Sequence, residues 1–207
     1  MIFVTADIHA GHKNIIKYCK RPWADVEQMD DALFGNINRL VRPTGDTLYI
    51  IGDFTFQPPA GLSRYRRRIN CQDVHLILGN HDQTPVPTGV FSSVSGYMEL
   101  RHNHALFTLC HYPFRTWNRS HKNTRDRIQS VDLYGHVHNT LPPPPNTAAV
   151  DAGVDAQNYA PITLDQALEQ ARRPYEPGYE AWYVNRVREI EAARALERRN
   201  ETDNRQH

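Results

Sequence analysis

The sequence is poor in cysteine and has no excess of charge of either sign. Its 207 residues include three cysteines that form no Cys-x-x-Cys pair, which excludes a disulfide framework and a cysteine-based zinc ribbon. Lys and Arg number 24 against 23 Asp and Glu, so the net charge predicts no general attraction to nucleic acid or membranes. The chain also lacks a basic signal-peptide region and any apolar run near the roughly 18 residues of a membrane span. These absences favour a cytoplasmic protein with no membrane partner.

In the first half of the chain, short apolar runs alternate with segments whose apolar residues recur at helical spacing. Strands are predicted at 2–6, 47–51 and 74–78. A helix is predicted over 25–41, because apolar residues recur there every three or four positions. A further helix is expected around the Arg-rich segment 64–69. This order is typical of parallel strands covered by helices, an α/β arrangement.

In the second half, predicted strands follow one another without long helices between them, which favours a mixed or antiparallel sheet. These strands are 97–101, 105–110, 131–134 and 148–154. From Tyr179 onward a helical pattern returns, and we expect this helix to fray after Asn200. The predicted organisation is therefore a domain over 1–175 and a C-terminal amphipathic helix with a frayed tail over 176–207. The helix either packs back on the core or forms a contact in a homo-oligomer.

The eleven histidines are many for this length, and polar clusters follow the predicted strands. Three polar residues directly after a core strand are unfavourable unless they are hydrogen-bonded or bind a ligand. Each cluster alone is a weak signal, but parallel strands bring the loops at their carboxyl ends together. The clusters are Asp7-Ile8-His9, Gly52-Asp53, Gly79-Asn80-His81-Asp82, Cys110-His111 and Gly135-His136-Val137-His138.

In this order the clusters resemble the five motifs of the calcineurin-like metallophosphoesterase superfamily: Asp-x-His, Gly-Asp, Gly-Asn-His-Asp or Gly-Asn-His-Glu, a lone His, and Gly-His-x-His. All five lie between Asp7 and His138. The sequence looks like a small bacterial or phage branch, because Gly52-Asp53-Phe54 lacks the Asp-Arg-Gly continuation of the protein Ser/Thr phosphatases, and Asp82 stands where they carry Glu. The resemblance implies a sandwich of two mixed β-sheets flanked by helices, with the site at one edge.

The resemblance also implies two divalent metal ions with Asp53 as the shared ligand. The first ion would be bound by Asp7, His9, Asp53 and His138, and the second by Asp53, Asn80, His111 and His136. These ligand types suit Mn, Fe, Zn or Ni, so the metal stays open, with manganese one of the expected ions. A water held between two such ions loses a proton near neutral pH, and the hydroxide is placed for in-line attack on phosphorus.

Other residues of the motifs are candidates for catalysis and substrate binding. We expect His81 to protonate the leaving oxygen as a general acid, with Asp82 orienting its ring; the alternative for His81 is a spacer beside a metal ligand. Candidate phosphate contacts, for which surface charges or helix caps are the alternative, are Asn80, His12, Arg21 and Arg115. Aromatic residues that either stack on a nucleobase or belong to the core are Phe54, Phe56, Tyr112, Phe114 and Trp117.

These features predict a hydrolase, a dinuclear metal-dependent phosphodiesterase or phosphatase. Its substrate is expected to be a small phosphodiester or phosphomonoester, with a nucleotide-derived ester among the candidates. One alternative is a nuclease, which the balanced charge disfavours for long duplex DNA. A second alternative is a noncatalytic scaffold on the same fold, which would be expected to have lost ligands, whereas every expected ligand type is present here.

Overall fold

The computed structural model describes residues 1–203, and its first sheet contains the N-terminal strands. The strands of this sheet are β1 (Ile2–Thr5), β2 (Thr47–Ile51), β3 (Asp73–Ile77), β4 (Ser93–Ser95) and β9 (Ile162–Thr163). They lie in the order β4-β3-β2-β1-β9, and only β9 runs antiparallel to its neighbour. The predicted parallel arrangement of the first three strands is confirmed. The carboxyl ends of β1, β2 and β3 therefore lie at one edge.

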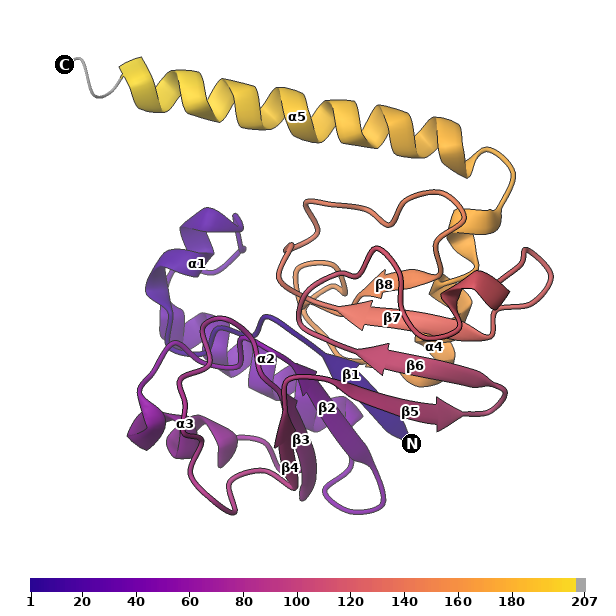
Figure 1. The fold of residues 1–207 in the computed structure, drawn as a ribbon. Coiled ribbons are helices and arrows are strands. Elements are labelled where there is room, and N and C mark those ends of the chain that lie inside the picture. The colour runs from indigo at the N-terminus through magenta and orange to yellow at the C-terminus, as the bar shows by residue number, and fades with distance from the viewer. Residues whose placement is uncertain (204–207) are drawn as a thin grey trace.

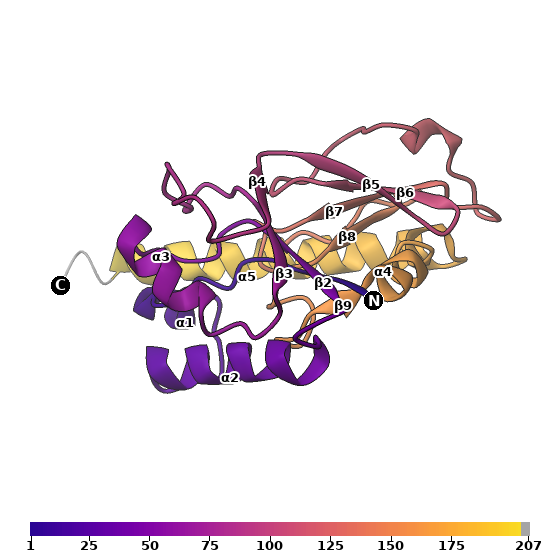
Figure 2. The same ribbon diagram turned by 90° about the horizontal axis from the view of Figure 1, so that it is seen from below.

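The second sheet is mixed, as the sequence predicts. Its strands are β5 (Met98–His102), β6 (Ala105–Leu109), β7 (Ser130–Tyr134) and β8 (Ala149–Asp151). In the order β5-β6-β7-β8, the first pair is antiparallel and the other two pairs are parallel. The two sheets pack together with helices outside them (Figures 1 and 2). The predicted sandwich of two mixed sheets is confirmed.

Five helices accompany the sheets within the described residues. They are α1 (Lys13–Tyr18), α2 (Val26–Leu40), α3 (Pro59–Arg66), α4 (Leu164–Gln170) and α5 (Tyr179–Asp203), with short 3-10 turns at Ser120–Lys122 and Arg173–Tyr175. The predicted helix over 25–41 is α2, and it begins where the Asp25 side chain accepts a hydrogen bond from the Gln28 backbone N–H. Its apolar face, which includes Leu33 and Ile37, is buried against the first sheet.

Alternate residues of the first sheet point into two separate cores. Leu48 and Ile50 of β2 pack toward α2, whereas Ile51 packs in the layer between the sheets. In that layer it joins apolar residues of the second sheet such as Phe107 and Leu133. Because both faces are covered, the strands read as continuous apolar runs and not as alternating ones.

Helix α5 lies apart from the sheets and spans the gap between α1 and the loops that follow β7 and β8 (Figure 1). Its first residue, Tyr179, is buried and donates its hydroxyl to the Pro143 carbonyl at 2.8 Å. Near its other end, Arg194 donates to Thr140 Oγ1 at 3.1 Å, and Glu197 pairs with Lys20 at 2.8 Å. The helix runs to Asp203, past the predicted fraying point, and the tail at 204–207 lies outside the described residues. Of the described helices, none has the length and hydropathy of a membrane span.

Candidate metal centre

The structure brings all seven predicted metal ligands to one edge of the sandwich. They come from the loops after five strands: Asp7 and His9 after β1, Asp53 after β2, Asn80 after β3, His111 after β6, and His136 and His138 after β7. Two overlapping groups, Asp7 with His9 and His138, and Asp7 with Asp53 and His111, each have candidate ligand atoms within 4.8 Å of one another. The parallel strand order explains this convergence of residues that are far apart in sequence.

Most of these ligands occupy an unusual backbone conformation. The φ angles of five of them are positive: Asp7 56°, His9 51°, Asp53 52°, His136 69° and His138 47°. The loops are also hydrogen-bonded to each other, since the Asp7 N–H donates to the Gly52 carbonyl at 3.1 Å and the His9 N–H donates to the Asp53 carbonyl at 2.9 Å. The surrounding fold thus holds a left-handed conformation that L-residues disfavour.

Two glycines allow the ligands to approach one another. A Cβ at Gly52, where φ is +81°, would lie 2.3 Å from Nδ1 of His111. A Cβ at Gly79 would lie 2.2 Å from a carboxylate oxygen of Asp53. Both positions therefore require the residue that the Gly-Asp and Gly-Asn-His-Asp motifs provide.

The first group of ligands contains buried polar atoms without partners. Both ring nitrogens of His9 are buried and make no hydrogen bond to any described residue. Burial lowers the pKa of His9 to about 3, so its imidazole is neutral and can coordinate a cation. Burial raises the pKa of Asp7 to about 7, although its oxygens accept the His136 N–H at 2.9 and 3.0 Å. A nearby cation would stabilise this buried carboxylate.

Asn80 and His136 lie beside the second group, close to Asp53 and His111. His111 Nε2 lies 3.0 Å from Asn80 Oδ1 and 3.3 Å from Asp53 Oδ2, and His136 Nδ1 lies 3.0 Å from the same Asn80 oxygen. The other nitrogen of His111, Nδ1, lies 3.1 Å from the Ile51 carbonyl, which orients the ring. Burial opposes ionisation of Asp53, but hydrogen bonding and charge from His111 outweigh it and lower the pKa of Asp53 to about 2.

Asp53 lies between His9 of the first group and His111 of the second. The oxygen that faces His111 is also 3.4 Å from Nε2 of His9. The combination of ionised carboxylate, neutral imidazole and amide oxygen fits divalent cations, and the unpartnered nitrogens of His9 give this fit a second, independent support. The chain can therefore hold metal at this edge of the sandwich.

A carboxylate that the sequence analysis missed lies behind His138. Asp155 Oδ2 is 2.7 Å from Nδ1 of His138, and Arg21 donates to both oxygens of Asp155 at 2.8 Å. Although burial opposes protonation, the hydrogen bond with Asp155 raises the pKa of His138 to about 10. Asp155 directly follows a predicted strand, 148–154, which is the same signal that identified the other clusters. Cys19 lies close to His138 and Asp155, and candidate ligand atoms of these three residues lie within 4.8 Å of one another.

The prediction that Arg21 contacts substrate phosphate is wrong. Its guanidinium is buried, and besides Asp155 it donates to the carbonyls of Ile8 and Asp7 and to the sulfur of Met29. These contacts occupy all five N–H groups that an arginine offers. Arg21 instead ties the loop after β1 to Asp155.

The expected role of Asp82 is also corrected. Its two oxygens accept the backbone N–H groups of Asp53, Phe54 and Gly79 at 2.8 to 2.9 Å, and no described contact joins them to the His81 ring. Asp82 therefore holds the loops after β2 and β3 together and does not orient His81.

The remaining candidate residues differ in their position relative to the two groups of candidate metal ligands. A cavity of about 410 Å³ opens over the groups, and both His81 and His12 line it. The His81 ring centre is 5.3 Å from that of His9, and the His12 ring stacks on Phe56 at 4.5 Å. Arg115 is exposed and is not among the residues that line this cavity. The structure thus places His81 and His12, but not Arg115, beside the ligands.

Comparison with known proteins agrees with this geometry. A sequence model of the calcineurin-like phosphoesterase family matches residues 1–185. The uncharacterized protein MJ1445 of Methanocaldococcus jannaschii is 28% identical over 169 residues, covering 79% of this chain and 87% of that protein. The crystal structure of the Aquifex aeolicus protein of unknown function AQ665 superposes with a TM-score of 0.62 at 22% identity, covering 82% of this chain and 98% of the other, and so shares the fold. The family match spans most of the sequence, and the chain belongs to the calcineurin-like phosphoesterases.

Proposed function

We propose that the protein is a dinuclear metal-dependent phosphoesterase that hydrolyses small phosphate esters. The observation that carries this proposal is the position of Asp53 between two sets of ligand-type side chains, 3.3 Å from His111 Nε2 and 3.4 Å from His9 Nε2. A carboxylate shared in this way is typical of sites that hold two cations for phosphoryl transfer. The membership in the family supports the reaction class.

The ligands divide into two sets that share Asp53. The first set is Asp7, His9, Asp53 and His138, and the second is Asp53, Asn80, His111 and His136. When bound, two divalent ions of the Mn, Fe, Zn or Ni type supply Lewis acidity and lower the pKa of coordinated water. The protein fixes the ligand rings from behind, with Asp155 on His138 and the Ile51 carbonyl on His111.

His81 is the proposed general acid. Its backbone N–H donates to Asp53 Oδ1 at 2.9 Å, which fixes the residue next to the shared ligand. Its ring faces the cavity between His9 and Phe56 and does not belong to either ligand set. A donor at this position can protonate the oxygen of a leaving alcohol.

The surroundings of the cavity favour a small substrate. Thr140 and Tyr18 line the cavity. Helix α5 contacts the chain at Thr140, through Arg194, and near Tyr18 at Lys20, through Glu197. A helix held close to the cavity in this way would hinder the approach of a long duplex or a folded protein. We accordingly infer a small phosphodiester or phosphomonoester as substrate.

The test is hydrolysis of bis-p-nitrophenyl phosphate and p-nitrophenyl phosphate by metal-stripped protein to which Mn, Ni, Zn or Mg is returned. The expected result is metal-restored turnover that disappears in Asp53→Ala and persists in Asp165→Ala, a change of an exposed acid on α4. The faster ester identifies the substrate type. A folded protein that binds no metal and turns over neither ester would support the noncatalytic scaffold.

A further inference from the structure

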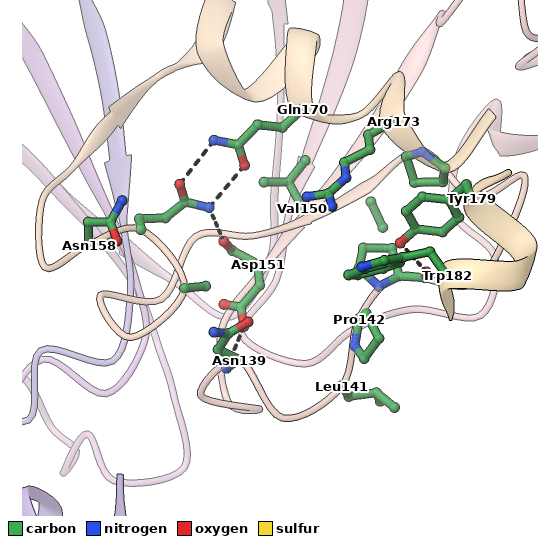
Figure 3. Close-up of a pocket in the computed structure, with 15 residues that line it drawn as sticks. Asn139, Leu141, Pro142, Val150, Asp151, Asn158, Gln170, Arg173, Tyr179 and Trp182 are labelled. Atoms are coloured by element: carbon green, nitrogen blue, oxygen red, sulfur yellow. Dashed lines mark hydrogen bonds between the residues drawn. The ribbon is translucent and has the colours of Figure 1, made fainter. Parts of the chain in front are cut away.

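A second cavity of about 400 Å³ lies beside the metal centre, and nothing in the proposed reaction uses it. Figure 3 shows its walls, which come from the loop after β7, from β8, from the end of α4 and from the first turns of α5. Labelled residues on opposite sides of the view are Gln170 and Asn158 on one side and Trp182 and Tyr179 on the other. The cavity therefore lies in the region that α5 spans.

The two cavities share one wall, the loop 137–141. Val137, His138 and Thr140 line the metal cavity, whereas Asn139 and Leu141 line the second one. Thr140 and Asn139 are both exposed at this wall. A ligand that occupies both cavities would therefore cross the loop at these two residues.

Apolar groups suited to a planar ring form one side of the second cavity. Trp182 is 39% exposed, although it is one of the largest apolar side chains, and Pro142 and Val150 lie on the same cavity. Tyr179 is held by its hydrogen bond to Pro143, which fixes the start of α5 and with it the position of Trp182. Partly exposed aromatic residues in a cavity wall commonly stack on flat ligands.

Amide groups with free hydrogen-bonding capacity form the opposite side. Gln157 and Gln170 donate to each other's side-chain oxygens at 3.0 Å, and Gln157 also donates to the Asp151 carbonyl at 2.6 Å. These bonds use both N–H groups of Gln157 but leave one N–H of Gln170 and a lone pair on each amide oxygen. Neighbouring donors and acceptors of this kind match the edge of a nucleobase.

The charged side chains at the cavity, one acidic and one basic, are compatible with an uncharged base. The Arg173 guanidinium is exposed and lies 4.7 Å from the centre of the Trp182 ring. The acidic residue of the cavity, Asp151, is hydrogen-bonded to the backbone. Its two oxygens accept the N–H groups of Asn139 and Gly153 at 3.0 and 2.8 Å. Asp151 and Arg173 are the charged residues among the described lining residues, and a neighbouring group already contacts each of them.

We propose that this second cavity binds the nucleoside part of a nucleotide ester whose phosphate lies at the metal centre. The proposal rests on the proposed function, which it extends by naming the substrate class. The flat apolar wall and the amide edge fit a nucleobase better than the sugar of a sugar phosphate, which offers no planar aromatic ring to stack. Trp182 and Gln170 are the residues that would select it.

The test compares two diesters that share a leaving group, the p-nitrophenyl ester of thymidine 5′-monophosphate and bis-p-nitrophenyl phosphate. In Trp182→Ala the KM of the nucleotide ester should rise by about tenfold, with kcat within about twofold, because stacking contributes to binding and not to chemistry. The KM of bis-p-nitrophenyl phosphate should stay unchanged. Gln170→Ala should show the same pattern more weakly, and Val184→Ala, an exposed change on the same helix, should show none.

Equal KM changes for both esters, or no change in Trp182→Ala and Gln170→Ala, would overturn the proposal while leaving the phosphoesterase activity in place. If the wild type turns over neither ester, the proposed function fails. Calorimetry with thymidine 5′-monophosphate then tests separately whether the cavity binds a nucleotide. Binding to the wild type that weakens about tenfold in Trp182→Ala supports the site. Absence of binding, or equal affinity in the two proteins, contradicts it.

Discussion

Asp155 Oδ2 lies 2.7 Å from Nδ1 of His138, so a buried carboxylate holds this candidate ligand from the side away from the cavity. Arg21 binds the same carboxylate through two hydrogen bonds of 2.8 Å. The orientation of His138 thus depends on residues that do not themselves belong to either ligand set.

Asp155→Asn should weaken metal binding by about 10- to 100-fold, because it removes the charge that fixes the His138 ring. The measurement is a metal titration of the stripped protein, with circular dichroism to show that the fold is retained. Asp165→Asn, on the surface of α4, is the matched control and should bind metal as the wild type does. Unchanged affinity in Asp155→Asn would mean that His138 needs no such support.

Asp53→Ala should lose both ions, whereas His9→Ala should lose one. The difference is expected because Asp53 contacts both ligand sets and His9 only one. Metal analysis of the purified variants gives the number of ions per chain directly. Two ions retained in Asp53→Ala would disprove the shared ligand.

His81→Gln should slow the hydrolysis of esters with poor leaving groups much more than that of p-nitrophenyl esters. A general acid contributes about 10²- to 10⁴-fold when the leaving oxygen needs a proton, and little when p-nitrophenolate leaves unaided. The measurement is kcat for phenyl and p-nitrophenyl esters in parallel. His104→Gln, in the exposed turn between β5 and β6, serves as the control. An equal loss for both esters would assign His81 a binding role.

Asp82→Ala should reduce stability more than it alters chemistry. The change leaves three backbone N–H groups of buried loops without their acceptor. Unfolding in urea should show a loss of about 2–5 kcal/mol, and the pH dependence of turnover in the folded protein should keep its shape. A shifted pH profile with unchanged stability would restore the role in orienting His81.

Asp132→Asn should stabilise the protein at pH 8 and make its stability less dependent on pH. Asp132 of β7 is fully buried, and burial raises its pKa from 3.8 to about 7. Because the pKa is higher in the folded state, protonated Asp132 stabilises the fold. This contribution is complete below about pH 4 and is lost as the pH rises to about 7. The free energy of unfolding of the wild type should therefore fall by up to about 4 kcal/mol more than that of the variant between pH 4 and 8.

The structure around Asp132 explains why the neutral amide fits. Its Oδ2 accepts the Phe114 N–H at 3.0 Å, an interaction that the Asn oxygen retains. Its other oxygen has no partner, and neither does Oγ1 of Thr108, the residue directly opposite in β6. The new NH₂ group can donate to that hydroxyl. Urea unfolding of both proteins at pH 5 and pH 8 would measure the effect. An equal change in the free energy of unfolding of the two proteins between these pH values would contradict it.

Sequence alone was sufficient for the long and periodic elements and for placing the candidate ligands at strand ends. β2 has the predicted bounds, and α2 begins one residue after its predicted start and ends one residue before its predicted end, at Leu40. The candidate ligands could be expected to lie together because the ends of parallel strands must meet. Helix α1 and the two-residue strand β9 were missed, since six and two residues are too short for a period to emerge.

Side-chain partners were much harder to predict than positions. The charges of Arg21 and Asp82 suggest substrate binding and catalysis, but each side chain is hydrogen-bonded to groups that only the three-dimensional structure brings within reach. Asp155 lies far from Arg21 in sequence, and their pairing depends on how the loop after β8 returns to the loop after β1. Such pairings follow from tertiary packing, which composition and spacing do not encode.

The left-handed backbone of five candidate ligands has a consequence for the stability of the fold. Each such non-glycine residue costs the fold about 1–2 kcal/mol, and glycine at the same position would avoid most of that strain. Glycine would also remove the carboxylate or the imidazole. Replacing one of these residues with glycine should therefore relieve backbone strain while it removes a candidate ligand, so stability and metal binding pull in opposite directions at this edge of the sandwich.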